Sequence, residues 1–169
     1  YWPAPEEADR TVWKHWVMIV RPHELQTNKA LLYISGGRNA RDAPEPDPRN
    51  IAMAKEMGGI MISLHQVPNQ PISFADGKGR SEDDFIAYGW DKYLRTGDPL
   101  WLARLPMTKS AVRAMDAVQE LMRTREGGGV EVDGFVVAGG SKRGWTTWTT
   151  AATDTRVVAI APAVIDLLN

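Results

Sequence analysis

The chain has 169 residues, of which 43% are hydrophobic and 24% charged, and its 20 Lys and Arg side chains nearly balance 21 Asp and Glu. This length and composition are typical of one globular domain, spanning residues 1–169. A formal net charge of -1 gives no basic surface for a nucleic acid or an anionic membrane, so neither partner is expected. Because cysteine is absent and the three histidines share no metal-ligand spacing, we expect neither a metal site nor a cofactor.

The first half of the chain alternates apolar runs with polar loops. Residues 11–20 are rich in β-branched and aromatic side chains and predict a strand, and residues 29–35 predict a buried strand that ends at Gly36 and Gly37. A proline-rich surface loop over 38–49 leads to a helix over 50–57 and a third apolar strand over 60–64. The loop 65–71 contains two prolines and cannot be helical, because a residue before proline is pushed toward an extended conformation.

The second half continues the alternation. Ser81 and three acidic residues predict the start of a helix over 81–94, and helices over 109–123 and 142–153 flank a strand over 130–138. A last apolar strand is expected over 156–165, and no run is long enough to span a membrane. Continuously apolar strands separated by helices predict an α/β fold, with a mostly parallel sheet and helices on both faces.

The most informative motif lies at residues 139–144, where the predicted strand meets the next helix. Ser141 stands among glycines at this junction, which is where α/β-hydrolases place a nucleophilic serine on a sharp turn. The usual motif is G-x-S-x-G, whereas here Arg143 occupies the second position after the serine and Gly144 the third. Ser141 could instead be an ordinary helix N-cap.

Oxyanion donors are expected from two places. The backbone N–H of Lys142 opens the helix after Ser141, and Gly36 and Gly37 follow an earlier strand in a loop that allows close backbone approach. The Lys142 side chain could add positive charge near the oxyanion or bind an acidic substrate group, or it could simply be solvated. His65, Gln66 and Asn69 are expected at the rim of the pocket.

Two nucleotide-binding motifs are alternatives for the same segment. Residues 138–142 resemble the start of a dinucleotide-binding loop, with Asp166 placed to bind a ribose, but Arg143 and Trp145 stand where that loop needs glycine. An NAD(P)-binding oxidoreductase therefore remains only a lesser alternative. A phosphate-binding P-loop is excluded, because no G-K-[ST] string occurs.

Long strings of the sequence resemble the PhoPQ-activated pathogenicity-related protein family. They include residues 140–148 (GSKRGWTTW), 162–169 (PAVIDLLN) and 66–71 (QVPNQP), and the matches run from about Trp13 to Asn169. The resemblance implies an α/β-hydrolase related to serine hydrolases, distantly similar to glucuronoyl esterases. It also implies a secreted or periplasmic, virulence-associated protein whose substrate is not established.

Carried over from the family, Ser141 is the expected nucleophile. Asp166 follows the last predicted strand and is either the acid that orients a histidine or a residue that caps the loop. In α/β-hydrolases the order along the chain is serine, acid, histidine, yet all three histidines precede Ser141. His15 is expected to be a packed or half-exposed strand residue, and His65 could be a catalytic base only in an unusual arrangement. We therefore expect the chain to be the N-terminal portion of a longer hydrolase, incomplete at its C-terminus, with the missing half following it or supplied as another chain.

Two classes of function follow. The first is hydrolysis of an ester or amide through an acyl-enzyme on Ser141, with a small-molecule, glycan or peptide ester as substrate. The second is a non-catalytic, secreted hydrolase-fold protein that acts by binding or signalling. In either case we expect these residues alone to be inactive or marginally stable.

Overall fold

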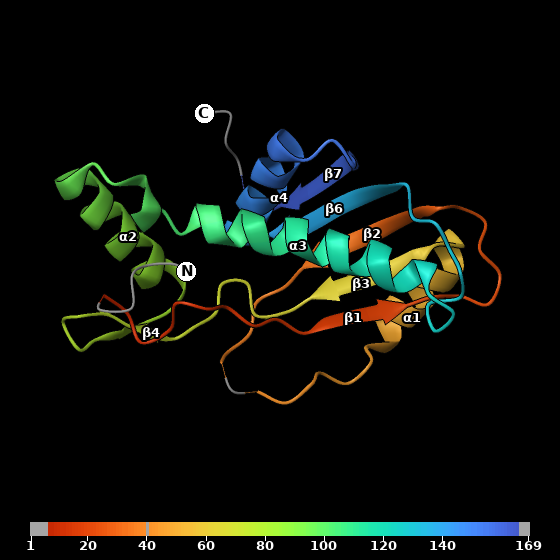
Figure 1. Ribbon diagram of the computed structural model, residues 1–169, viewed down its shortest axis with the longest axis horizontal. Coiled ribbons are helices and arrows are strands. Elements are labelled where there is room, and N and C mark those ends of the chain that lie inside the picture. The colour runs from red at the N-terminus through yellow and green to blue at the C-terminus, as the bar shows by residue number, and fades with distance from the viewer. Residues whose placement is uncertain (1–6, 40, 166–169) are drawn as a thin grey trace.

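The computed structural model describes residues 7–39 and 41–165. In these ranges the chain forms two sheets, four α-helices and one short 3₁₀ helix (Figure 1). The elements are β1 (Val17–Val20), β2 (Lys29–Ile34), α1 (Pro48–Met57), β3 (Ile60–Leu64), β4 (Ile72–Ser73), β5 (Gly79–Arg80), α2 (Glu82–Thr96), η1 (Pro99–Trp101), α3 (Arg104–Arg123), β6 (Gly134–Gly140), α4 (Lys142–Thr153) and β7 (Val157–Ala163).

The main sheet has five strands in the order β1-β3-β2-β6-β7. Strands β3, β2, β6 and β7 are parallel, and β1 pairs with β3 in the antiparallel direction. This confirms the predicted α/β fold with a mostly parallel sheet. No helix among the described residues has the length and apolar character needed to cross a membrane.

Helices cover both faces of the sheet. Helix α3 lies along one face (Figure 1), where Met107, Met115 and Val118 pack on the buried side chains of β2, β3 and β6. Helix α4 joins α3, and the hydroxyls of Thr108 and Thr149 lie 2.6 Å apart between them. Helix α1 packs on the opposite face, where Asn50 donates a hydrogen bond to Ser63 of β3. The main core therefore lies between β2, β3, β6 and α3.

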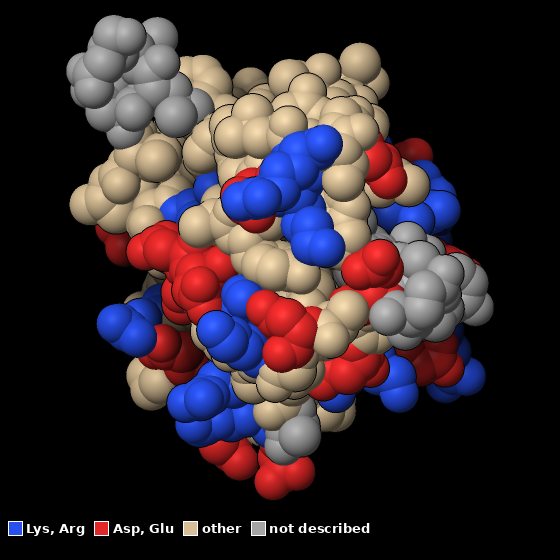
Figure 2. All heavy atoms as spheres, turned by 90° about the vertical axis from the view of Figure 1, so that its left-hand side faces the viewer, with Lys and Arg blue, Asp and Glu red and all other residues tan. Residues whose placement is uncertain are grey.

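A second, smaller core lies beneath α2. Phe74, Phe85 and Trp101 are buried there, with Tyr88 packed against them. The guanidinium of Arg80 sits 4.0 Å from the Tyr88 ring centroid and is paired with Asp76. On the outer surface of this end of the molecule, basic and acidic side chains are interspersed (Figure 2).

Several predicted boundaries were wrong. The strand predicted over 11–20 is limited to Val17–Val20, because Lys14 bonds to the Asn69 side chain instead of to a neighbouring strand. Helix α3 begins at Arg104, before the predicted start, since Pro106 is tolerated in the first turn of a helix. The side chain of Ser81 makes no capping hydrogen bond at the start of α2, although the predicted acids do occupy the first turn.

Candidate active site

The carboxyl ends of β2, β3 and β6 meet at one edge of the sheet. Ile34 of β2 is in register with Leu64 of β3 and with Gly139 of β6. The residues that follow these strands are therefore brought to the same edge, which is where ligands bind in open parallel sheets. Ser141 follows β6, Gly36 follows β2 and His65 follows β3.

Ser141 occupies the sharp turn between β6 and α4. Its backbone has φ 54° and ψ −125°, a positive φ that non-glycine residues rarely adopt. Its side chain is exposed and makes no hydrogen bond that caps α4, so an ordinary N-cap role does not describe it. The turn is held by a 2.9 Å hydrogen bond from the Ser141 N–H to the Ala163 carbonyl of β7. A serine hydroxyl is thus presented at the edge of the sheet by a strained backbone.

The glycines around Ser141 permit close packing of α4 against the sheet. A Cβ at Gly139 would lie 2.7 Å from the carbonyl oxygen of Arg143, and one at Gly144 would lie 2.5 Å from the Ile165 side chain. Neither position tolerates a side chain without movement. In this chain α4 contacts the strands at residue 144, three positions after Ser141. The glycine of the motif therefore stands at residue 144 and not at residue 143.

Two groups of backbone donors lie near this turn. The N–H of Lys142 is in the first turn of α4, where N–H groups have no partner within the helix. The loop after β2 is fixed by a 2.8 Å hydrogen bond from the Gln66 N–H to the Gly36 carbonyl, and Gly37 has φ 142°. A Cβ at Gly36 would lie 2.6 Å from Nη2 of Arg143, so the loop lies against the first turn of α4.

The two cations after Ser141 share one carboxylate. Nζ of Lys142 lies 2.7 Å from Oε2 of Glu82, and Nη2 of Arg143 lies 2.8 Å from Oε1 of the same residue. Nζ of Lys142 also lies 3.0 Å from Asp83, and Nε of Arg143 donates to the Val67 carbonyl at 2.6 Å. The Lys142 side chain is only 10% exposed and is paired with two carboxylates, so the solvated alternative was wrong, whereas a contribution of its charge near the oxyanion stays a prediction.

Glu82 is held ionised by this arrangement. Burial alone would raise its pKa, but hydrogen bonds from Arg143, Lys142 and Gln70 outweigh that effect and lower the pKa to about 2. Gln70 also accepts a hydrogen bond from the Glu82 N–H at 2.8 Å and donates to the Gly37 carbonyl at 3.1 Å. One amide side chain therefore connects the start of α2 to the glycine loop after β2.

Arg104 adds a further cation behind the turn. Its Nη1 donates to the Lys142 carbonyl at 2.7 Å, and its guanidinium stacks 4.0 Å from the Trp145 ring centroid. Burial lowers the pKa of Arg104 to about 10, so the side chain stays charged at neutral pH.

The loop 65–71 places the predicted rim residues close to the glycine loop. His65 and Gln66 line one cavity with Gly36 and Gly37, and Gln66 and Asn69 line an adjoining cavity. Nδ1 of His15 lies 3.1 Å from the His65 carbonyl, and burial lowers the pKa of both imidazoles. Among the described residues no histidine is hydrogen-bonded to Ser141, and Asp166 lies outside the described residues.

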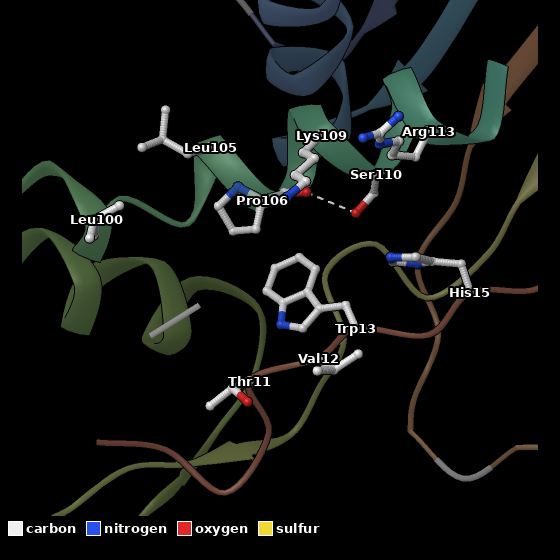
Figure 3. Close-up of a pocket in the computed structure, with 10 residues that line it drawn as sticks. All are labelled: Thr11, Val12, Trp13, His15, Leu100, Leu105, Pro106, Lys109, Ser110 and Arg113. Carbon is white, nitrogen blue, oxygen red and sulfur yellow. Dashed lines mark hydrogen bonds between the residues drawn. The ribbon is translucent and has the colours of Figure 1, made fainter. Parts of the chain in front are cut away.

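A third cavity, of about 420 Å³, lies between α3 and the segment before β1 (Figure 3). Its walls are largely apolar, with Pro106 facing the Trp13 indole and Lys109 and Arg113 on the helix side. Ser141 does not line it.

Within the described ranges, no group of three or more histidines and carboxylates is placed to hold a metal ion.

Three contributors to the site were missed from sequence. Glu82, Gln70 and Arg104 reach the turn from α2, the loop 65–71 and α3, which are distant from Ser141 along the chain. A run of acids at a helix start is explained equally well by the helix dipole, so no local signal marked Glu82 as a partner of Arg143.

Comparison with known proteins identifies the family of this chain. The family described as PhoPQ-activated pathogenicity-related protein matches residues 1–169. The chain belongs to this family. "Autocrine proliferation repressor protein A" of Dictyostelium discoideum is 46% identical over 172 residues, which are 99% of this chain and 34% of that protein. The chain thus spans about a third of the length of this relative.

A solved structure of an acetyl xylan esterase from Paenibacillus sp. R4 is similar over 88% of this chain and 43% of that chain. The sequence identity is 16% and the TM-score is 0.48. The α/β assignment made above rests on the strand order and the helix layers of this chain itself.

Proposed function

We propose that this chain carries the nucleophile and the oxyanion donors of a serine hydrolase that cleaves an ester or amide. The backbone conformation of Ser141 is the observation that carries the proposal. A serine with a positive φ, exposed at the junction of a central parallel strand and a helix, is the arrangement that α/β-hydrolases use for their nucleophile. The energetic cost of such a conformation, of order 1–3 kcal/mol, persists where a functional group needs that position.

In the proposed reaction, Oγ of Ser141 attacks the substrate carbonyl carbon and its proton passes to a general base. The negative charge that forms on the carbonyl oxygen is stabilised by the Lys142 N–H and by an N–H of the Gly36–Gly37 loop. The leaving alcohol or amine takes the proton from the base, and water then hydrolyses the acyl-enzyme by the same route. The base would be a histidine outside residues 1–169, oriented by Asp166.

A fluorophosphonate probe on the full-length protein tests this proposal. Wild type should be labelled at Ser141, and Ser141→Ala should not be labelled. Ser73→Ala is a matched control, because Ser73 lies on β4 in the two-stranded sheet, which is separate from the five-stranded sheet that leads to Ser141, and its loss should leave labelling unchanged. Absence of labelling in a wild-type protein with a native thermal transition would contradict the proposal.

A second candidate is a regulatory protein that acts by binding. The 46% identical relative is named a proliferation repressor, which is a role that does not require turnover. A folded but unlabelled wild type would favour this candidate. Export from the cell, expected from the family resemblance, is a prediction for both candidates and can be tested by cell fractionation.

A further inference from the structure

We propose that a basic cleft beside the glycine loop binds an oxyanionic group, a carboxylate or a phosphate, of a ring-containing substrate. This rests on the proposed hydrolase function and adds a substrate class to it. The cleft consists of two adjoining cavities of about 470 and 550 Å³ that share Trp16, Arg41 and Gln66. Because Gly36 and Gly37 line the first cavity, the cleft begins at the predicted oxyanion loop.

The cleft is strongly basic. Arg10, Lys14, Arg38 and Arg41 line it, whereas Asp42 is the acidic residue among its lining residues. Within the described part of the chain none of these four cations forms a salt bridge, although other cations near the site, such as Lys142 and Arg143, are paired. Burial lowers the pKa of both His15 and His65, so the charge at neutral pH comes from the arginines and the lysine. Four cations that form no salt bridge with the described residues, spread over two adjoining cavities, favour an anionic ligand.

Neighbouring side chains fix the backbone that carries these cations. The Gln66 side chain donates to the Arg38 carbonyl at 2.8 Å, and the Trp16 indole donates to the Arg41 carbonyl at 3.1 Å. Asn69 accepts from the Lys14 N–H and donates to the Lys14 carbonyl, both at 2.9 Å. Gln66 and Asn69 are themselves buried. The Lys14, Arg38 and Arg41 side chains are themselves exposed, but backbone held in this way reduces the ordering cost of binding.

The cleft also has an aromatic wall. Trp16 is 43% exposed, and its indole nitrogen is already used by the Arg41 carbonyl. Its remaining surface is apolar and suits stacking against the ring of a sugar or an aromatic group. A cationic cavity with an exposed indole therefore indicates a ring that carries an oxyanion.

Binding is tested first without turnover, by calorimetry on full-length Ser141→Ala protein. Benzoate and phenyl phosphate should bind at least tenfold more tightly than neutral benzamide, and the two anions distinguish a carboxylate from a phosphate site. Arg41→Gln and Lys14→Gln should each weaken anion binding by roughly tenfold. Arg95→Gln, which removes an exposed cation on α2, should not change it. Equal binding of benzamide, or no effect of the two cleft variants, would overturn the proposal.

Turnover by the wild-type protein is the second readout. The value of kcat/KM for 4-acetoxybenzoate should exceed that for its methyl ester, and Arg41→Gln should abolish the difference. Anion binding without hydrolysis of either ester would uphold the cleft and contradict the hydrolase. Hydrolysis with no preference between the esters, together with no preferential anion binding, would uphold the hydrolase and overturn the cleft.

Discussion

The carboxylate of Glu82 lies 2.8 Å from the guanidinium of Arg143, two residues after the exposed serine. Through this pair and the adjacent Lys142, helix α2 is connected to the first turn of α4. Gln70 joins the same carboxylate to the glycine loop after β2. The strained turn at Ser141 and the predicted oxyanion loop are thus held together by one ion-pair network.

Glu82→Gln should therefore lower thermal stability in a pH-dependent way. The pKa of Glu82 is about 2 in the folded protein, below the ordinary value of 4.5 that it has in the unfolded chain, so its contribution is fully present above pH 4.5. That contribution is lost as the pH falls from 4.5 toward 2. Because the side chain is 43% exposed, solvent screening limits the loss at pH 7 to about 1–2 kcal/mol.

Thermal unfolding of the wild-type protein and of Glu82→Gln between pH 7 and pH 2.5 tests this pH dependence. The difference in melting temperature should be largest at neutral pH and should shrink in acid. Asp83→Asn is a suitable control, because Asp83 is 92% exposed and contacts only the lysine of this network. A Glu82→Gln effect that is constant over this pH range would contradict the assignment.

Gly144→Ala should destabilise the protein by about 1–3 kcal/mol, since an added Cβ would lie 2.5 Å from the Ile165 side chain and 3.0 Å from two carbonyl oxygens. Gly79→Ala is the matched control, because its Cβ would make only contacts of 3.5 Å or longer and its φ is not positive. Chemical denaturation measures the free energy of unfolding of both variants. Equal stability of the two variants would show that α4 does not require glycine at residue 144.

Ser141→Gly should be more stable than Ser141→Ala. Glycine adopts φ 54° and ψ −125° without the strain that any Cβ imposes, and relief of that strain outweighs the backbone entropy of glycine by about 1 kcal/mol. Both variants lack the hydroxyl, so their difference in free energy of unfolding isolates the backbone. An alanine variant as stable as the glycine variant would mean that the turn is not strained.

The order and type of the main elements were predictable because continuously apolar strands and amphipathic helices leave a strong local pattern. The positions of Ser141 and of the glycine loop were predictable for a similar reason, since both directly follow strand ends, whereas their catalytic roles stay predictions. The network around Glu82 was not, because it joins residues that are 61 positions apart and depends on how α2 packs. The failed prediction for residues 11–16 has the same origin: the Asn69 side chain, 55 positions away, takes the hydrogen bonds of Lys14.

Asn69→Ala should cost about 1–3 kcal/mol of stability and should weaken anion binding in the basic cleft. Asn69 is 1% exposed and makes hydrogen bonds to both backbone groups of Lys14 and to the Gln66 carbonyl, so its loss leaves buried polar groups without partners. It also releases the segment that carries Lys14. Asn39→Ala is a useful comparison, because Asn39 lines the same cavity but its side chain bonds to the exposed Pro71 carbonyl and leaves Lys14 in place. Calorimetric binding of benzoate, measured well below the melting temperature of each variant, should therefore fall more for Asn69→Ala than for Asn39→Ala. An equal loss in both would mean that the cleft depends on its lining side chains and not on the fixed backbone beneath Lys14.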